Sequence, residues 1–186
     1  MKELSLNILD IAQNSVKAKA DTIKILLKET SDKLIIEIID NGCGMKSDFL
    51  RSVTDPFTTT RTTRKVGLGI PLFKLSCQQT GGDLKISSRH EEEYPDSHGT
   101  EVCAIFYKNH LDFTPLGDIV STLTVLIQGQ PNIRWIFEHI TEKGSVNLDT
   151  DGLKAVLGDV PLDTFEVIVW ISEYLKEQYS EIGYNL

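Results

Sequence analysis

The fold is indicated most clearly by the stretch Leu34-Ile35-Ile36-Glu37-Ile38-Ile39-Asp40-Asn41-Gly42-Cys43-Gly44. Its first six residues are mostly β-branched and apolar, which is typical of a buried strand. Asp40 therefore lies at the end of that strand, partly desolvated, where its carboxylate needs a donor such as an exocyclic amine. Gly42 and Gly44 let a flat ring approach the backbone. The stretch predicts a core strand that leads into a binding loop.

Working outward toward the N-terminus, the pattern predicts a helix over residues 4–18 and a strand over Thr22–Lys28 that pairs with Leu34–Ile39. Apolar side chains fill one half of the helical wheel, and the other half is polar. Three side chains share one polar arc of this helix: Asp10, Asn14 and Lys17. A carboxylate, a neutral oxygen ligand and a cation side by side suit a water, a Mg²⁺ ion and a phosphate, respectively. The alternative for the helix alone is a solvated face.

Toward the C-terminus, Gly67-Leu68-Gly69 stands directly before a predicted helix. Glycines there leave backbone amides free at a helix N-terminus, which is a natural seat for phosphate. The chain contains neither a Walker P-loop nor the G-x-G-x-x-G of a dinucleotide fold. The other elements predicted up to residue 110 are helices over about 46–54 and 70–80 and strands over about 84–89 and 100–107.

The charge pattern divides the chain near residue 110. Residues 111–186 contain twelve acidic and four basic side chains, whereas residues 1–110 contain 15 of each. We therefore expect a first domain over 1–110 and a small acidic α+β appendage of unknown role over 111–186. Its predicted elements are a helix over about 116–128, a hairpin over Ile133–Thr141 and Ser145–Leu148, and helices over about 151–157 and 162–181.

Two predictions concern how this C-terminal region packs. Trp135 and Trp170 are expected to anchor its core. The last helix is expected to pack on the hairpin through a row at helical spacing, made of Phe165, Val169 (or Ile168), Ser172, Leu175 and Tyr179.

Composition excludes several classes of protein. With 186 residues, 40 % of them hydrophobic, the chain builds a packed core. A net charge of −8 disfavours nucleic-acid binding, because phosphate neutralisation needs a basic surface. No apolar run reaches the roughly 18 residues of a membrane span. The N-terminus lacks a signal peptide, and three cysteines without a C-x-x-C pair indicate reduced thiols, so we expect a cytoplasmic protein.

Taken in order, the motifs resemble those of the GHKL ATP-binding superfamily, which includes DNA gyrase, a heat-shock chaperone, sensor histidine kinases and MutL. The motifs are Asp10…Asn14, Asp40-x-Gly42-x-Gly44, Pro56-Phe57, Gly67-x-Gly69 and Gly99-Thr100. The resemblance covers about the first 110 residues. It implies an α/β two-layer sandwich, with a mixed, mainly antiparallel sheet and helices on one face, followed here by the small C-terminal α+β region.

The resemblance also implies roles for single residues. Asn14 would ligate a Mg²⁺ ion that bridges the phosphates of ATP, and Asp40 would accept a hydrogen bond from the adenine amine. The adenine pocket would be completed by Gly42, Gly44, Met45 and Thr100. The phosphates would meet Lys17, then Thr60 and Arg61 of a lid over Thr58–Val66, and finally the amides of Gly67, Leu68 and Gly69.

The function implied is Mg²⁺-dependent binding of ATP and ADP. Hydrolysis would be slow, or ATP would drive a switch that acts on a partner protein through residues 111–186. Asp10 would be the catalytic residue, but hydrolytic members usually carry Glu there, and Asp is one methylene shorter. The alternatives are a protein-serine kinase of the anti-sigma-factor type, a histidine kinase, or a non-catalytic ATP/ADP sensor. Homodimers are frequent in this superfamily.

Overall fold

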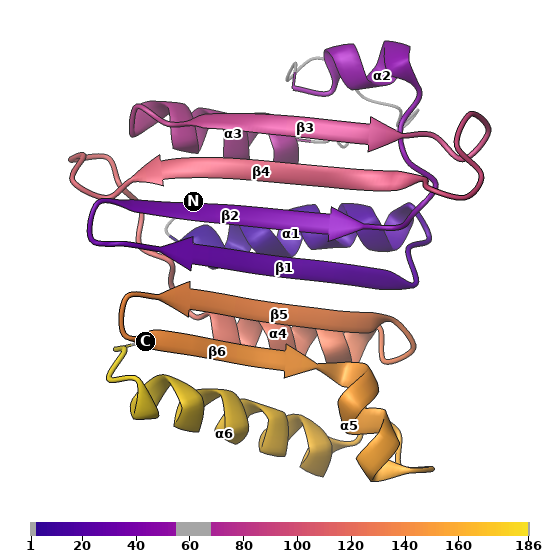
Figure 1. Cartoon of the computed structure of the whole chain (residues 1–186), viewed down its shortest axis with the longest axis vertical. Coiled ribbons are helices and arrows are strands. Elements are labelled where there is room, and N and C mark those ends of the chain that lie inside the picture. The colour runs from indigo at the N-terminus through magenta and orange to yellow at the C-terminus, as the bar shows by residue number, and fades with distance from the viewer. Residues whose placement is uncertain (1–2, 55–67, 186) are drawn as a thin grey trace.

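The computed structural model describes residues 3–54 and 68–185, which form one six-stranded sheet with helices on one face (Figure 1). The strand order is β3-β4-β2-β1-β5-β6. The elements are α1 (Leu4–Lys17), β1 (Thr22–Glu29), β2 (Lys33–Asp40), α2 (Ser47–Ser52), α3 (Gly69–Gln79), β3 (Asp83–Arg89), β4 (Gly99–Tyr107), α4 (Ile119–Gly129), β5 (Arg134–Thr141), β6 (Gly144–Asp149), α5 (Thr150–Leu157) and α6 (Phe165–Glu181).

The sheet is mixed, as predicted. Strand β1 pairs in parallel with β5, and the pairs β1–β2, β2–β4, β3–β4 and β5–β6 are antiparallel. Burial alternates along β2, whose even-numbered residues from Leu34 to Ile38 are buried against the helices, while Ile35, Glu37 and Ile39 lie on the other face. The fold class predicted from the sequence is therefore confirmed.

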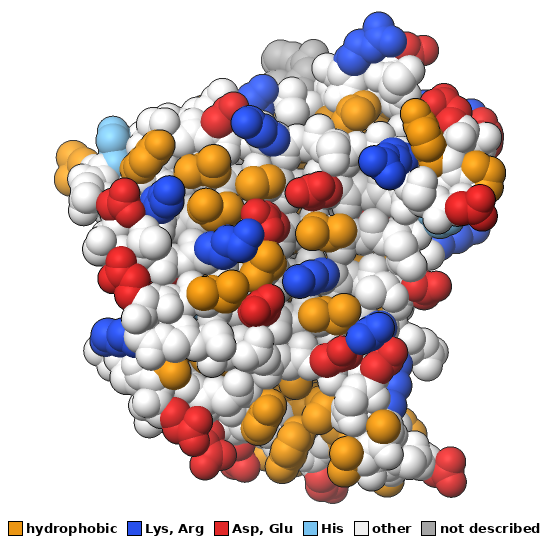
Figure 2. Space-filling model, viewed as in Figure 1, with side chains coloured by type: hydrophobic (Ala, Val, Ile, Leu, Met, Phe, Trp, Pro, Cys, Tyr) orange, Lys and Arg blue, Asp and Glu red, His pale blue; other side chains and the backbone are white. Residues whose placement is uncertain are grey.

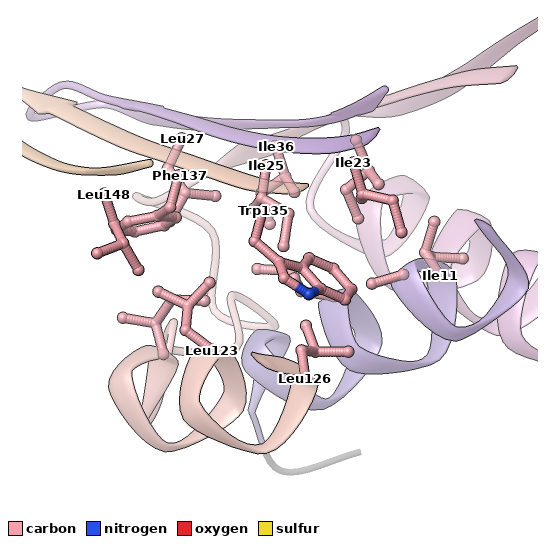
Figure 3. Packing of buried hydrophobic residues seen from close by; sticks show 14 of the residues in the cluster. Ile11, Ile23, Ile25, Leu27, Ile36, Leu123, Leu126, Trp135, Phe137 and Leu148 are labelled. Carbon is pink, nitrogen blue, oxygen red and sulfur yellow. The ribbon is translucent and has the colours of Figure 1, made fainter. Parts of the chain in front are cut away.

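The two parts of the chain share this sheet and its core. Side chains of α1, β1 and β2 pack directly against those of α4, β5 and β6, as Figure 3 shows for Ile11, Ile25 and Ile36 beside Leu126, Trp135 and Phe137. The division at residue 110 therefore stays a prediction, which concerns the ligand that each region binds.

The C-terminal region also holds the start of α1. The backbone N–H groups of Leu4 and Ser5 have no partner within the helix, and they donate to the carbonyl oxygens of Pro115 and Leu116 at 3.0 and 2.8 Å. This contact fixes α1, which carries the predicted site residues, against the segment that leads into α4.

Helix α6 packs on β6 of the hairpin, as predicted, but part of its predicted contact row was wrong. The helix packs on α4 and β6 through Val167, Ile171, Leu175 and Tyr179, whereas Phe165 and Val169 face solvent. Ile168, the alternative to Val169, is partly buried against the core. Leu175 and Tyr179 belong to both the predicted and the observed rows. The other apolar residues of this helix lie all round it, so periodicity alone did not fix the buried side.

The two tryptophans differ as well. Trp135 is 1 % exposed and lies in the shared core, as predicted, but Trp170 is 48 % exposed on α6 and is not a core anchor.

The other face of the sheet is open. Figure 2 shows charged and hydrophobic side chains interspersed on it. Lys24 pairs with Glu138, and Lys28 pairs with Glu37. Within residues 3–54 and 68–185, no helix is long and apolar enough to cross a membrane.

Candidate functional site

Asp40 ends β2 as a buried carboxylate whose two oxygens are both engaged. Its Oδ1 accepts hydrogen bonds from the backbone N–H groups of Gly42 at 2.9 Å and Thr100 at 3.2 Å. Its Oδ2 accepts from the Ser15 hydroxyl of α1 at 2.5 Å. A carboxylate offers about four lone-pair positions. Among the described residues three donors fill three of these positions, so the side chain is fixed in orientation with one acceptor position left.

The glycine loop after Asp40 requires both of its glycines. Gly44 has φ +69°, and a Cβ placed on it would lie 1.9 Å from the Arg89 carbonyl oxygen. A Cβ on Gly42 would lie 2.7 Å from the carbonyl oxygen of Ala18, at the end of α1. The loop therefore packs closely against both the end of β3 and the end of α1.

Hydroxyl groups of β3 and β4 hold the next part of this loop. Ser88 Oγ donates to the Gly99 carbonyl at 3.0 Å and accepts from the backbone N–H of Met45 at 2.8 Å. Because its one proton is used on Gly99, the Thr100 hydroxyl donates to it, at 2.8 Å. Met45 and Thr100, both predicted pocket residues, are thus tied together beside Asp40.

The polar side of α1 meets the start of α3. Asp10 and Asn14 are exposed on α1. A Cβ built on Gly69 would lie 3.5 Å from Asp10 Cβ and 3.9 Å from Asn14 Nδ2. The first turn of α3, whose amides have no partner within the helix, therefore adjoins the predicted carboxylate and metal ligand. Leu68, directly before the helix, is 41 % exposed.

Lys17 lies at the other end of this polar side, beside the glycine loop. It helps to line a pocket of about 240 Å³ whose other lining residues are Ala18, Lys19, Gly42, Cys43, Glu91 and His98. His98 Nδ1 lies 2.6 Å from the Gly42 carbonyl oxygen. A carbonyl only accepts, so the tautomer with the proton on Nδ1 donates here.

Three predicted residues lie outside the described part of the chain, namely Thr60, Arg61 and Gly67, and so does the predicted lid over Thr58–Val66. The structure brings the remaining predicted residues into two groups. One surrounds Asp40 at the ends of β2 and β4, and the other joins α1 to the start of α3.

Sequence reasoning missed Ser15, Ser88 and His98. The role of Ser15 could have been predicted, because its hydroxyl lies on the apolar half of α1 and needs a polar partner once it is buried. The roles of Ser88 and His98 depend on the strand register and on how the loop between β3 and β4 folds back, which no local pattern gives.

Comparison with known proteins identifies the first part of the chain. A family model described as histidine kinase-, DNA gyrase B- and HSP90-like ATPase matches residues 2–110. Over 89 residues, the chain is 34 % identical to the signal transduction histidine-protein kinase AtoS of Escherichia coli, and the match covers 47 % of this chain and 14 % of that protein. Over 54 residues, it is 35 % identical to the DNA mismatch repair protein MutL of Chlorobaculum tepidum, covering 29 % of this chain and 8 % of that one. The matched segments are thus small parts of both relatives.

Solved structures share the fold over a longer stretch. The N-terminal domain of a DNA repair protein superimposes with a TM-score of 0.58 at 20 % identity, covering 86 % of this chain and 58 % of that one. The MutL ATPase domain of Aquifex aeolicus, complexed with ADP, gives 0.56 at 14 % identity, covering 84 % and 69 %. Both matches span more residues than 1–110 contain, so the similarity of fold extends into the C-terminal region.

Proposed function

The chain belongs to the histidine kinase-, DNA gyrase B- and HSP90-like ATPase family, and from this premise we propose that it binds ATP, hydrolyses it slowly and thereby switches a partner protein. Nucleotide binding is assigned to residues 1–110 and contact with the partner to residues 111–186. The observation that carries the proposal is the state of Asp40, a buried carboxylate oriented by three donors with one acceptor position left.

The residues around Asp40 fit a purine base. The exocyclic amine of adenine is a donor that matches the remaining acceptor position of the carboxylate. The two glycines let the loop lie close beside Asp40, because a side chain at either position would collide with Arg89 or Ala18. Ser15 positions Asp40, since its hydroxyl reaches the oxygen that the backbone amides do not.

The residues at α1 and α3 fit a phosphate tail. The amides at the start of α3, from Leu68 and Gly69, are donors for phosphate oxygens. Lys17, and Arg61 of the lid, would offset phosphate charge.

The described residues contain no group of three His, Cys, Asp or Glu side chains that could hold a metal ion by themselves. A Mg²⁺ ion at this site would therefore take Asn14 together with oxygens of the nucleotide, and its positive charge would neutralise phosphate charge.

In this mechanism Asp10 takes the proton of the attacking water. Its carboxylate is exposed beside Gly69 and one helical turn before Asn14. General-base catalysis requires an approach of about 3 Å to the water. The short Asp side chain makes that approach infrequent, and for this reason we propose slow turnover. The similarity to AtoS supports transfer to a protein side chain as the second candidate function.

The test is to incubate the purified chain with γ-labelled ATP and Mg²⁺ and to measure where the labelled phosphate goes. Catalytic release of labelled phosphate that is lost in Asn14→Ala, and reduced about 100-fold in Asp10→Asn, is expected. Intact ATP in the presence of measurable binding would overturn hydrolysis, and label that becomes attached to added protein would favour the kinase.

A further inference from the structure

Helix α6 exposes two aromatic rings that the core does not use. Trp170 is 48 % exposed and Tyr174 is 36 % exposed, and their rings stack with centroids 5.1 Å apart and planes 8° apart. They lie four residues apart, on a side of the helix next to the buried row of Ile171 and Leu175. Exposed, ordered aromatic pairs of this kind are typical of interaction surfaces.

Acidic side chains flank this pair on its solvent-exposed side, and the one exposed lysine of α6, Lys176, lies about a third of a turn away around the helix. Glu166 lies one helical turn before Trp170, and an exposed row on the same side of α6 contains Glu173, Glu177 and Glu181. Figure 2 shows hydrophobic side chains over α6 at the lower edge of the molecule with acidic side chains beside them. Between residues 150 and 186 there are seven acidic and two basic side chains. The rings thus lie in a strongly negative surface.

We propose that this surface, the aromatic–acidic side of α6, is the docking site for a protein segment rich in arginine or lysine. It consists of Glu166, Trp170, Glu173, Tyr174, Glu177 and Glu181. A guanidinium or ammonium group is attracted both by the face of an aromatic ring and by the carboxylates around it. The inference rests on the proposed function in one respect, namely that the partner binds through residues 111–186.

The negative charge of this surface favours a basic protein segment over a second copy of the chain and over nucleic acid. A second copy of the chain would bring the same carboxylates face to face, and like charges at an interface repel. Nucleic acid is repelled for the same reason. A basic segment is the partner whose charge complements this surface.

The experiment uses the full chain with ¹⁵N-labelled tryptophan, which has two indole N–H signals. The probe is a short synthetic peptide in which arginine and leucine alternate, and its control has glutamate for arginine. The Trp170 signal is expected to shift with the arginine peptide only, while the signal of buried Trp135 stays in place. Binding is expected to weaken with salt, because the charges are exposed.

Variants decide whether the surface itself binds. Trp170→Ala is expected to weaken peptide binding about tenfold, whereas Phe165→Ala, an exposed aromatic on the opposite side of α6, leaves it unchanged. Equal binding by wild type and Trp170→Ala, or equal binding of both peptides, would overturn the proposal. Concentration-dependent dimerisation that Trp170→Ala abolishes would also overturn it, in favour of a second copy.

ATP affinity is measured on the same proteins so that the two proposals fail separately. A wild type that binds ATP but not the arginine peptide would count against the docking site alone. A wild type that binds the peptide at α6 but no ATP would count against the proposed function alone.

Discussion

Among single residues, the proposed ATP binding depends most on the hydrogen bonds that orient Asp40. Ser15→Ala removes the hydroxyl that donates to Oδ2. Hydrogen bonds to a charged group contribute about 1.5–3 kcal/mol, and we expect a loss of that order in unfolding free energy. A less firmly oriented carboxylate should also lower ATP affinity about tenfold. Denaturant unfolding and calorimetric titration measure the two effects.

The control for Ser15 is Ser76→Ala, because Ser76 is a partly exposed serine of α3 whose hydroxyl, within the described residues, bonds to its own helix at the Leu72 carbonyl. It should change neither quantity appreciably. Wild-type affinity and stability in Ser15→Ala would remove Ser15 from the site.

Gly44 gives a second prediction for single residues. Gly44→Ala should displace the loop, because the new Cβ would meet the Arg89 carbonyl oxygen at a φ that alanine rarely adopts. We expect a loss of about 2 kcal/mol or more in stability, together with loss of ATP binding. Gly152→Ala in α5 is the matched control. Nothing lies near its Cβ, and alanine in a helix should stabilise by about 0.5–1 kcal/mol. The same sign for both variants would contradict this reading of the loop.

At the scale of elements, a buried polar network joins β1 to β5, α6 and the C-terminus at the far end of the sheet from Asp40. Glu29 accepts from His139 at 3.1 Å, Tyr184 at 2.8 Å and Lys108 at 2.6 Å. The Tyr179 hydroxyl, 2.9 Å from the other ring nitrogen of His139, donates to it. Burial would raise the pKa of Glu29, but these hydrogen bonds outweigh it and lower the pKa to about 2.

This network predicts a pH dependence of stability. Because the Glu29 pKa is lower in the folded than in the unfolded chain, its contribution is complete above about pH 4.5 and is lost as the pH falls toward 2. We expect the wild type to lose on the order of 2–3 kcal/mol from this group across that window. Glu29→Gln should remove this part of the slope, whereas Glu138→Gln, in an exposed pair with Lys24, should keep it. Identical slopes in wild type and Glu29→Gln would refute this role for the network.

Elements were the part of the structure most predictable from sequence. The apolar, mostly β-branched run of β2 and the helical period of α1 are local signals, and each element bound differs from prediction by only a few residues. The buried side of α6 was mispredicted because apolar side chains surround that helix. Two contacts join segments that are distant in the sequence, namely the hydrogen bond from Ser15 to Asp40 and the parallel pairing of β1 with β5. Such long-range contacts produce no periodic pattern in the sequence, so they could not be predicted from it.

At the scale of the whole molecule, the C-terminal region completes the fold. Strand β5 covers the edge of β1, and Trp135 and Phe137 fill the core that β1 shares with α1 and α4. A chain cut after residue 110 would expose that edge and core, so we expect it to aggregate or remain unfolded. Circular dichroism and size-exclusion chromatography measure this. A monomeric fragment with cooperative unfolding would show instead that residues 1–110 fold alone.

Asp40 is proposed to anchor ATP, and calorimetric titration of ATP with Mg²⁺ into the wild type and Asp40→Asn measures whether it does. Asp83→Asn, which alters an exposed acid of β3, controls for the change of charge, and thermal unfolding confirms that each variant is folded. We expect the wild type and Asp83→Asn to bind ATP, and we expect the ATP affinity of folded Asp40→Asn to be at least about tenfold lower. Equal affinity in all three proteins, or a folded wild type that binds no ATP, would contradict this proposal.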